Sequence, residues 1–215
     1  ASKMAYVAVG APVNMAGGQP VSLENLRAVR ELCRKRGVRV TLDGARAVEN
    51  ACMIQQREAA CRGWNVAKIL KEMCQLVDAV TVSAKKDAYV NIGGFLATHD
   101  EGLYEDAANL CVLFEGLHTY GGLAGRDLEA LAVGVREMVQ DDWIAHRLAQ
   151  VRYLGEKLVE EGVPVVKPFG GHAVFVDAKA FLPHLSQEEL PAQSLAAWIY
   201  EASGVRAMER GVVSA

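Results

Sequence analysis

The sequence has no long apolar run, no closely spaced cysteine pair and no large excess of one charge. No stretch approaches the roughly 20 apolar residues that a membrane-spanning helix needs. The 215 residues carry a formal net charge of −3, so electrostatics gives no reason to expect a nucleic acid or an anionic membrane as a partner. We therefore predict that the chain binds neither nucleic acid nor membrane.

The five cysteines are scattered along the chain, and no Cys-x-x-Cys or Cys/His spacing typical of a metal site occurs. An odd, unclustered count favours reduced thiols in a cytoplasmic protein and argues against a cysteine-bound metal. The first nine residues are too short and too strand-like for a signal peptide. With 51% hydrophobic and 23% charged residues, the composition is that of an ordinary globular protein.

Periodicity and turn residues predict alternating strands and helices. The predicted strands cover residues 4–9, 38–42, 79–82, 89–97, 163–166, 171–177 and 205–215. Helices are predicted between Ser22 and Gly37, over 66–74 and over 191–203. The stretch 103–162 is also predicted to be helical, with a glycine-rich break at 116–125 and its clearest helix at 143–161.

This alternation favours an α/β fold with a mostly parallel sheet. We expect residues 1–160 to form an incomplete large-domain core and residues 161–215 to begin a smaller α+β domain. Because predicted strands stand at both chain ends, we also expect a piece of a longer protein.

Two candidate chemical groups follow predicted strands, and ligands of open α/β sheets bind beyond the carboxyl ends of such strands. Lys86, beside Lys85, could attack an aldehyde if burial or the neighbouring cation lowered its pKa. Asp43 could keep the ring nitrogen of pyridoxal phosphate (PLP) protonated, which that cofactor needs to act as an electron sink. The plainer interpretations are a solvated lysine pair and a loop or helix-capping carboxylate.

Neighbouring residues could complete such a site. Arg46 could bond the phenolic oxygen of the cofactor, or form a weak surface ion pair with Glu49. Ser83 and the backbone around Ala84 could hold a phosphate, although no complete phosphate loop is present.

Five segments carry a resemblance to a known family. They are 14–22 (NMAGGQPVS), 43–51 (DGARAVENA), 83–87 (SAKKD), 120–123 (YGGL) and 191–196 (PAQSLA). Together they resemble the β-eliminating lyases, which have the aminotransferase-like PLP fold. The resemblance runs over essentially all 215 residues in one register.

The resemblance implies a role for each matching residue. Lys86 would be the Schiff-base lysine and a base for the α-proton, and Asp43 would pair with the ring nitrogen. Arg46 and Asn14 would bond the cofactor's 3-oxygen, and Ser83 and Lys85 would lie on the phosphate side. The Asn91 carbonyl would bind a monovalent cation such as potassium.

The implied substrate is a small amino acid. Segments 90–95, 122–127 and 208–215 favour members that convert L-tyrosine into phenol, pyruvate and ammonia over those that cleave L-tryptophan. Arg210 would meet the phenolic hydroxyl, a group that a guanidinium binds well and that an indole lacks. Without the resemblance, Arg210 would be an ordinary surface or interdomain arginine.

Two alternatives stay open. Segments 83–85 and 118–120 lean slightly toward a tryptophan-cleaving or other aromatic amino-acid lyase. The second alternative is a non-catalytic remnant of such a lyase. Family members are about twice as long as this chain, and the resemblance implies that their additional residues carry part of the active site. Cys52-Met53 and His118 also depart from the usual family residues. Family members are homo-oligomers, so a dimer or tetramer is expected.

Overall fold

The computed structural model describes residues 4–210, which divide into two compact units. The first unit contains residues 4–13 and 20–148, and the second contains residues 14–19 and 149–210. The division falls inside helix α6 (Asp141–Glu160), after Leu148. The predicted domain boundary near residue 160 stays a prediction.

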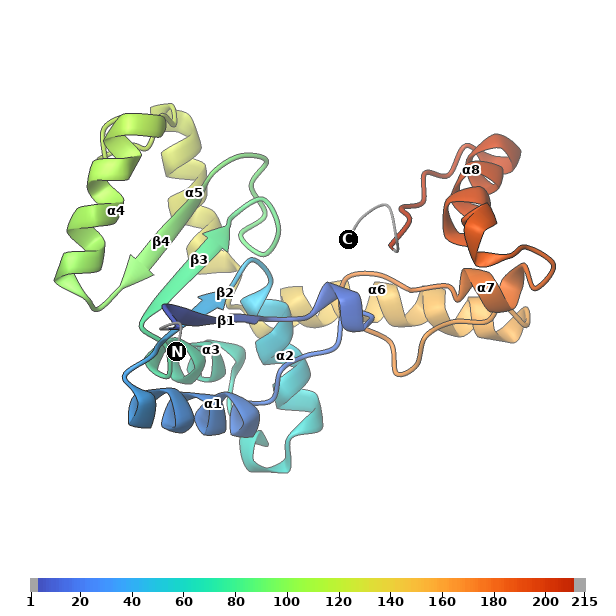
Figure 1. Cartoon of the computed structure of the whole chain (residues 1–215), viewed down its shortest axis with the longest axis horizontal. Coiled ribbons are helices and arrows are strands. Elements are labelled where there is room, and N and C mark those ends of the chain that lie inside the picture. Colours follow the sequence, from blue (N-terminus) through green and yellow to red (C-terminus); the bar gives the residue numbers. More distant parts are fainter. Residues whose placement is uncertain (1–3, 211–215) are drawn as a thin grey trace. The chain divides into compact units, whose positions relative to one another are not determined.

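The first unit is built on a four-stranded sheet whose strands lie side by side in chain order (Figure 1). The strands are β1 (Tyr6–Gly10), β2 (Arg39–Asp43), β3 (Ala79–Ser83) and β4 (Gly94–Thr98). The pairs β1–β2 and β2–β3 are parallel, and β3–β4 is antiparallel. The prediction of an α/β fold with a mostly parallel sheet is therefore confirmed.

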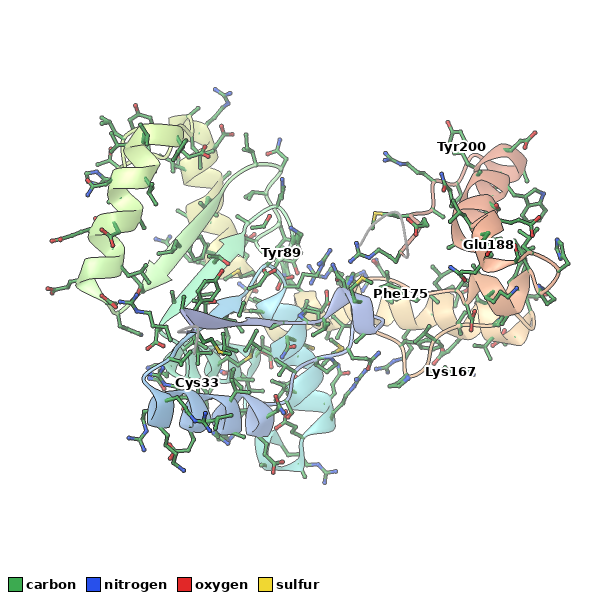
Figure 2. All side chains as sticks on the ribbon, in the orientation of Figure 1. Cys33, Tyr89, Lys167, Phe175, Glu188 and Tyr200 are labelled. Atoms are coloured by element: carbon green, nitrogen blue, oxygen red, sulfur yellow. The ribbon has the colours of Figure 1, made fainter. Side chains whose placement is uncertain are left out.

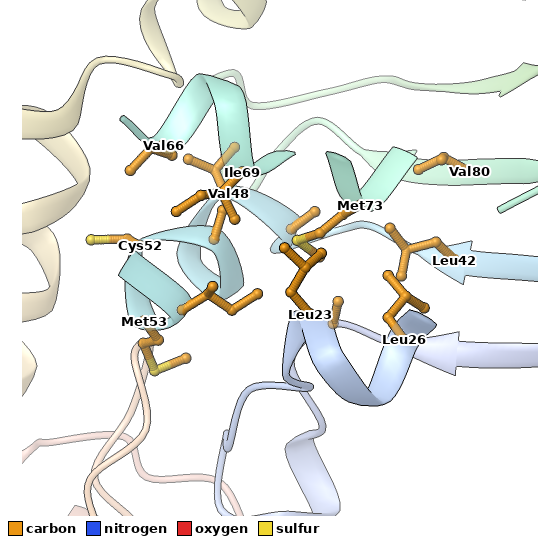
Figure 3. Packing of buried hydrophobic residues seen from close by; sticks show 14 of the residues in the cluster. Leu23, Leu26, Leu42, Val48, Cys52, Met53, Val66, Ile69, Met73 and Val80 are labelled. Carbon is orange, nitrogen blue, oxygen red and sulfur yellow. The ribbon is translucent and has the colours of Figure 1, made fainter. Parts of the chain in front are cut away.

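Helices α1 (Leu23–Arg36), α2 (Ala47–Arg57) and α3 (Val66–Gln75) pack on one face of this sheet (Figure 1). Strand β2 alternates, with Val40 and Leu42 buried, while Arg39 and Asp43 are exposed. The buried residues meet apolar side chains of the three helices, as Figure 3 shows for Leu42, Leu26 and Met73. Asp43 therefore points away from the face that packs on the helices, since successive strand residues point to opposite faces.

Sequence signals placed α1 correctly. The Ser22 hydroxyl accepts a hydrogen bond from the Asn25 amide at 3.0 Å, and Gly37 ends the helix with a φ of 63°. Both are usual terminating features, because the cap satisfies a free amide and glycine tolerates the left-handed conformation. The predicted helices over 66–74, 143–161 and 191–203 are likewise confirmed as α3, α6 and α8 (Pro191–Ser203).

The glycine-rich break is also confirmed, between α4 (Glu101–Phe114) and α5 (Gly125–Glu137). The strand predicted over 89–97 was wrong in its first half, because β4 begins only at Gly94. Tyr89 and Gly93 have φ values of 56° and 97°. An extended strand cannot continue through residues in that conformation.

The second unit contains the later part of α6, then α7 (Ala178–Phe181), the 3₁₀ helix η3 (Gln187–Glu189) and α8. The strands predicted over 163–166 and 171–177 were wrong, because only one antiparallel bridge forms, between Val165 and Val176. The strand predicted over 205–215 is wrong for 205–210, and its last five residues lie outside the described part.

The short segment 14–19 belongs to the second unit because it packs closely on residues 166–172. The Gln19 side-chain amide donates to the Pro168 carbonyl at 2.6 Å. Gly18 has a φ of 72°, and a Cβ there would lie 3.0 Å from the His172 ring. Only glycine combines that backbone conformation with such a close approach. Within residues 4–210, no helix is long and apolar enough to cross a bilayer.

Candidate active site

The candidate site lies in the first unit, at the edge where β2 and β3 end. Asp43 is the last residue of β2 and Ser83 the last residue of β3. The parallel register pairs Asp43 with Thr81, so Ser83 lies two residues further along the neighbouring strand. The sheet thus brings the turns after Asp43 and after Ser83 to one edge, which is where open α/β sheets bind ligands.

The Asp43 turn is held tightly against β3. The Gly44 amide donates to the Thr81 carbonyl at 2.8 Å, and one Asp43 carboxylate oxygen accepts from the Ala45 amide at 3.2 Å. A Cβ on Gly44 would lie 2.8 Å from the Val80 side chain, which leaves no room for a larger residue. Asp43 is therefore an exposed carboxylate on a fixed backbone.

The lysines occupy the turn that follows Ser83. Lys85 is exposed and Lys86 is half-buried, while Ala84 and Asp87 on either side are buried. The Ala84 amide donates to the Gly93 carbonyl at 3.1 Å. That amide is already used within the protein, so a phosphate near Ser83 would need other donors.

Asp87 fastens the lysine turn to the start of helix α2. One of its carboxylate oxygens accepts from the Val48 amide at 2.8 Å and from the Glu49 amide at 3.2 Å. The residue that precedes the helix, Arg46, makes no side-chain cap. Asp87 supplies the missing cap from 39 residues away, and only 2% of its surface is exposed.

Arg147 completes this anchor. Its Nη2 atom lies 2.6 Å from the other Asp87 oxygen and 3.4 Å from Glu49, which is fully buried. Its Nη1 atom donates to the Lys86 carbonyl at 3.5 Å. We call Arg147, Asp87 and Glu49 the Arg147 cluster.

Sequence reasoning did not find this cluster. Its members lie up to 98 residues apart, so no local motif joins them. The one available signal was Glu49 itself, an acidic residue in a segment rich in apolar residues. It was interpreted instead as a possible surface partner of Arg46. A buried carboxylate needs a charge or hydrogen-bond partner, which could have prompted the search for one.

Two further predicted residues also belong to the first unit. Arg46 is half-buried and directly precedes α2, in the turn that follows Asp43. Asn91 is exposed in the connection between β3 and β4. Among residues 4–210, no group of three or more histidine, cysteine or acidic side chains could hold a metal ion, and the predicted potassium site at the Asn91 carbonyl stays a prediction.

Asn14 and Arg210 belong to the second unit. Asn14 begins the 3₁₀ helix η1 (Asn14–Ala16). The Arg210 Nη2 atom lies 3.4 Å from the Met15 sulfur, so Arg210 lies beside the residue that follows Asn14. The buried Arg210 Nε atom has no hydrogen-bond partner among the described residues, which leaves one donor of this guanidinium uncommitted.

Comparison with known proteins defines the class. The β-eliminating lyase family matches residues 1–215, and the chain belongs to that family. The fold agrees, because 96% of the chain superposes on 52% of a protein assigned as an L-allo-threonine aldolase of Listeria monocytogenes EGD-E, with a TM-score of 0.65 at 20% identity. A threonine aldolase of Leishmania major gives a TM-score of 0.54 at 17% identity over 77% of this chain and 44% of its own.

Within the family, the chain is similar to curated tyrosine phenol-lyases. Those of Symbiobacterium sp. (strain SC-1) and Nostoc punctiforme (strain ATCC 29133 / PCC 73102) are 59% and 57% identical over the whole chain. The matches cover 47% and 46% of these relatives, so this chain spans about half of their length.

Proposed function

We propose that the protein to which this chain belongs is a PLP-dependent carbon–carbon lyase that converts L-tyrosine and water into phenol, pyruvate and ammonia. The observation that carries the proposal is identity of 52–59% to tyrosine phenol-lyases over every residue of the chain. The structure supports it by bringing the Asp43 turn and the Lys86 turn to one edge of the sheet.

The residues of this edge suit the cofactor. When bound, PLP would supply an electron sink for the negative charge that develops at the substrate α-carbon. Asp43, an exposed carboxylate on a fixed backbone, would hold the ring nitrogen protonated, and the Lys86 amine would bond the cofactor covalently. Arg46, which follows Asp43 by three residues, would bond the cofactor's 3-oxygen.

Other roles rest on the family relationship. Ser83 and Lys85 would lie on the phosphate side, Asn14 would share the 3-oxygen with Arg46, and the Asn91 carbonyl would help bind potassium. Lys86 would take the α-proton once the substrate amine has replaced it. The homo-oligomeric assembly and the cytoplasmic location expected from the sequence are part of the same proposal.

Arg210 would decide the substrate. A guanidinium donates a charge-assisted hydrogen bond to a phenolic oxygen. The Nε atom of Arg210 has no hydrogen-bond partner among residues 4–210, which supports this role. An indole ring offers no oxygen to accept this bond. The proposal therefore predicts a preference for L-tyrosine over L-tryptophan.

The test uses a chimera, called here the graft, in which this chain replaces the matching 47% of the Symbiobacterium sp. (strain SC-1) enzyme. We expect the graft to release phenol and pyruvate from L-tyrosine. Lys86→Ala should lower the rate at least about a hundredfold through loss of the base. Indole release from L-tryptophan at a higher rate would instead favour the tryptophan-cleaving alternative, and a graft that folds but turns over neither would favour the remnant.

A second variant tests the substrate role. Arg210→Val should lower phenol release from L-tyrosine roughly tenfold to a hundredfold, the effect of losing a hydrogen bond to a charged group. Elimination from an S-alkyl cysteine, which has no phenolic oxygen, should change little. An equal loss on both substrates would contradict the role of Arg210.

A further inference from the structure

The lysine turn presents two neighbouring amines that are chemically alike, and the proposed function uses only one of them for the covalent bond. Lys85 is exposed and Lys86 is half-buried. Adjacent side chains on a tight turn point in different directions, so the backbone orientation of the turn decides which amine faces the site. The question is what fixes that orientation.

Asp87, the residue after Lys86, is fixed by three interactions. Its carboxylate accepts from the Val48 and Glu49 amides at 2.8 and 3.2 Å and pairs with Arg147 at 2.6 Å. With 2% of its surface exposed, this carboxylate depends on these partners, because a buried charge without them is costly. Because the residue directly after Lys86 makes all three interactions, they oppose a rotation of the lysine turn.

Arg147 is itself held in place by the start of helix α6. The Asp141 carboxylate accepts from the Val66 amide at 3.0 Å and from the Gln55 side chain at 2.9 Å. Ile144 is fully buried, and Leu148 is nearly so. The guanidinium that reaches Asp87 and the Lys86 carbonyl is therefore attached to a part of α6 that is anchored on α2 and α3.

The turn that carries Asp43 is joined to the same anchor. Asp43 closes β2, and four residues later α2 begins at Ala47. Asp87 caps the first turn of that helix, and Glu49 on the same turn contacts Arg147. One buried cluster thus holds both turns that the proposed function requires.

We propose that the Arg147 cluster is a positioning device that selects Lys86 over Lys85 as the amine that bonds the cofactor. This proposal rests on the proposed function. Asp87 and Arg147 would determine which of the two lysines bonds the cofactor. Neither of these residues is proposed to touch the substrate or the cofactor. Their effect would pass through the backbone of the lysine turn.

The experiment locates the covalent bond rather than measuring turnover. The graft is loaded with PLP and reduced with borohydride, and peptide mass mapping measures the labelled fractions of Lys86 and Lys85. We expect the unsubstituted graft to carry the label on Lys86. Asp87→Ala should lower the Lys86-to-Lys85 ratio about tenfold, since a lost partner of a buried charge has an effect of that order.

Asp78→Asn is the matched control. Asp78 also pairs with an arginine, Arg30 at 2.7 Å, and also accepts a backbone amide, that of Val40 at 2.7 Å. It lies at the opposite edge of the sheet, directly before β3. This variant should lose stability but keep the label on Lys86. Arg147→Lys, which keeps the charge but not the forked geometry, should give an intermediate ratio.

Each outcome separates the inference from the proposed function. An unsubstituted graft without label on either lysine would overturn both. A graft labelled on Lys86 whose Asp87→Ala and Arg147→Lys variants keep the same ratio would overturn the positioning role alone. An equal shift in Asp78→Asn would also overturn it, by showing general destabilisation. If Asp87→Ala does not fold, as judged by circular dichroism, Asp87→Asn and Arg147→Lys decide the matter.

Discussion

At the residue scale, the position of the Asp43 carboxylate depends on the small residue beside it. Gly44 donates its amide to Thr81 and lies so close to β3 that a Cβ would meet Val80 at 2.8 Å and the Thr81 carbonyl at 3.4 Å. Any side chain here would push the end of β2 away from β3. Asp43 would then move relative to the lysine turn that follows β3.

Gly44→Ala should therefore lower the free energy of unfolding by about 1–3 kcal/mol, the usual cost of overpacking. Urea unfolding of the 215-residue chain, followed by circular dichroism, would measure it. Gly125→Ala is the control, because nothing lies within 4 Å of a Cβ at that helix start. Equal stability of the Gly44→Ala and unsubstituted chains would contradict the close packing.

A second residue-scale prediction concerns Asp78 and pH. Burial alone would raise the pKa of Asp78, but the hydrogen bonds from Arg30 and from the Val40 amide outweigh it and lower the pKa. A carboxyl group whose pKa is lower in the folded state stabilises the fold at pH values above its unfolded pKa of about 3.9. That contribution is lost as the pH falls through the lower folded pKa.

Asp78→Asn should accordingly cost about 2 kcal/mol at neutral pH, and the difference from the unsubstituted chain should shrink below about pH 4. Urea unfolding between about pH 2 and about pH 7, from roughly two units below to roughly three units above the unfolded pKa, would show it. Arg30→Gln should weaken the same pH dependence by removing the strongest partner. A difference that stays constant over the whole range would contradict the assignment.

At the scale of elements, the sequence predicted strands and helices where local signals were strong. The caps of α1 and the apolar face of α3 gave their positions directly. Helix α2 was missed because its first eight residues, from Ala47 to Ile54, are all buried. Its polar residues Glu49 and Asn50 are buried together with the apolar ones, so no solvent-facing stripe marks this part of the helix.

The same limit explains which parts of the candidate site could be predicted. Asp43 and Lys86 follow strands, so their place at a sheet edge could be inferred from the chain order of the elements. The Arg147 cluster joins three distant segments through buried charges, and nothing in any one segment indicates the others. Tyr89, labelled in Figure 2, is a similar case. Its φ is 56° and its ring lies 5.8 Å from that of Trp143, a tertiary contact that no local signal indicates.

The turn that carries Lys86 is also packed against helix α5. A Cβ on Gly134 would collide with the Ala88 carbonyl, so this helix approaches the turn as closely as its backbone allows. Helices α2, α5 and α6 therefore all constrain the turn over residues 84–88. Such constraint from several rigid elements is what a precisely held functional group requires.

At the scale of the whole molecule, the chain spans about half the length of the curated relatives it matches. One helix of the first unit, α4, exposes many of its apolar side chains. None of the residues of α4 is buried. Leu110, Val112, Leu113 and Phe114 are each at least half exposed, and Phe114 is 74% exposed. Exposed apolar side chains gathered on one element mark a surface that normally contacts other polypeptide.

We therefore expect the isolated 215-residue chain to self-associate through α4, because burying this surface removes apolar area from water. Sedimentation velocity over a range of concentrations should show oligomers, and the double substitution Leu113→Lys and Phe114→Lys should shift the distribution toward monomer. Leu32→Lys on α1, where a leucine is 57% exposed, is the control and should not shift it. If the chain is monomeric at every concentration, or if the control has the same effect, α4 is not the associating surface.

In the graft, we expect the remaining half of the relative to pack on the apolar side chains of α4. The same double substitution should therefore lower the stability of the graft and leave its association unchanged.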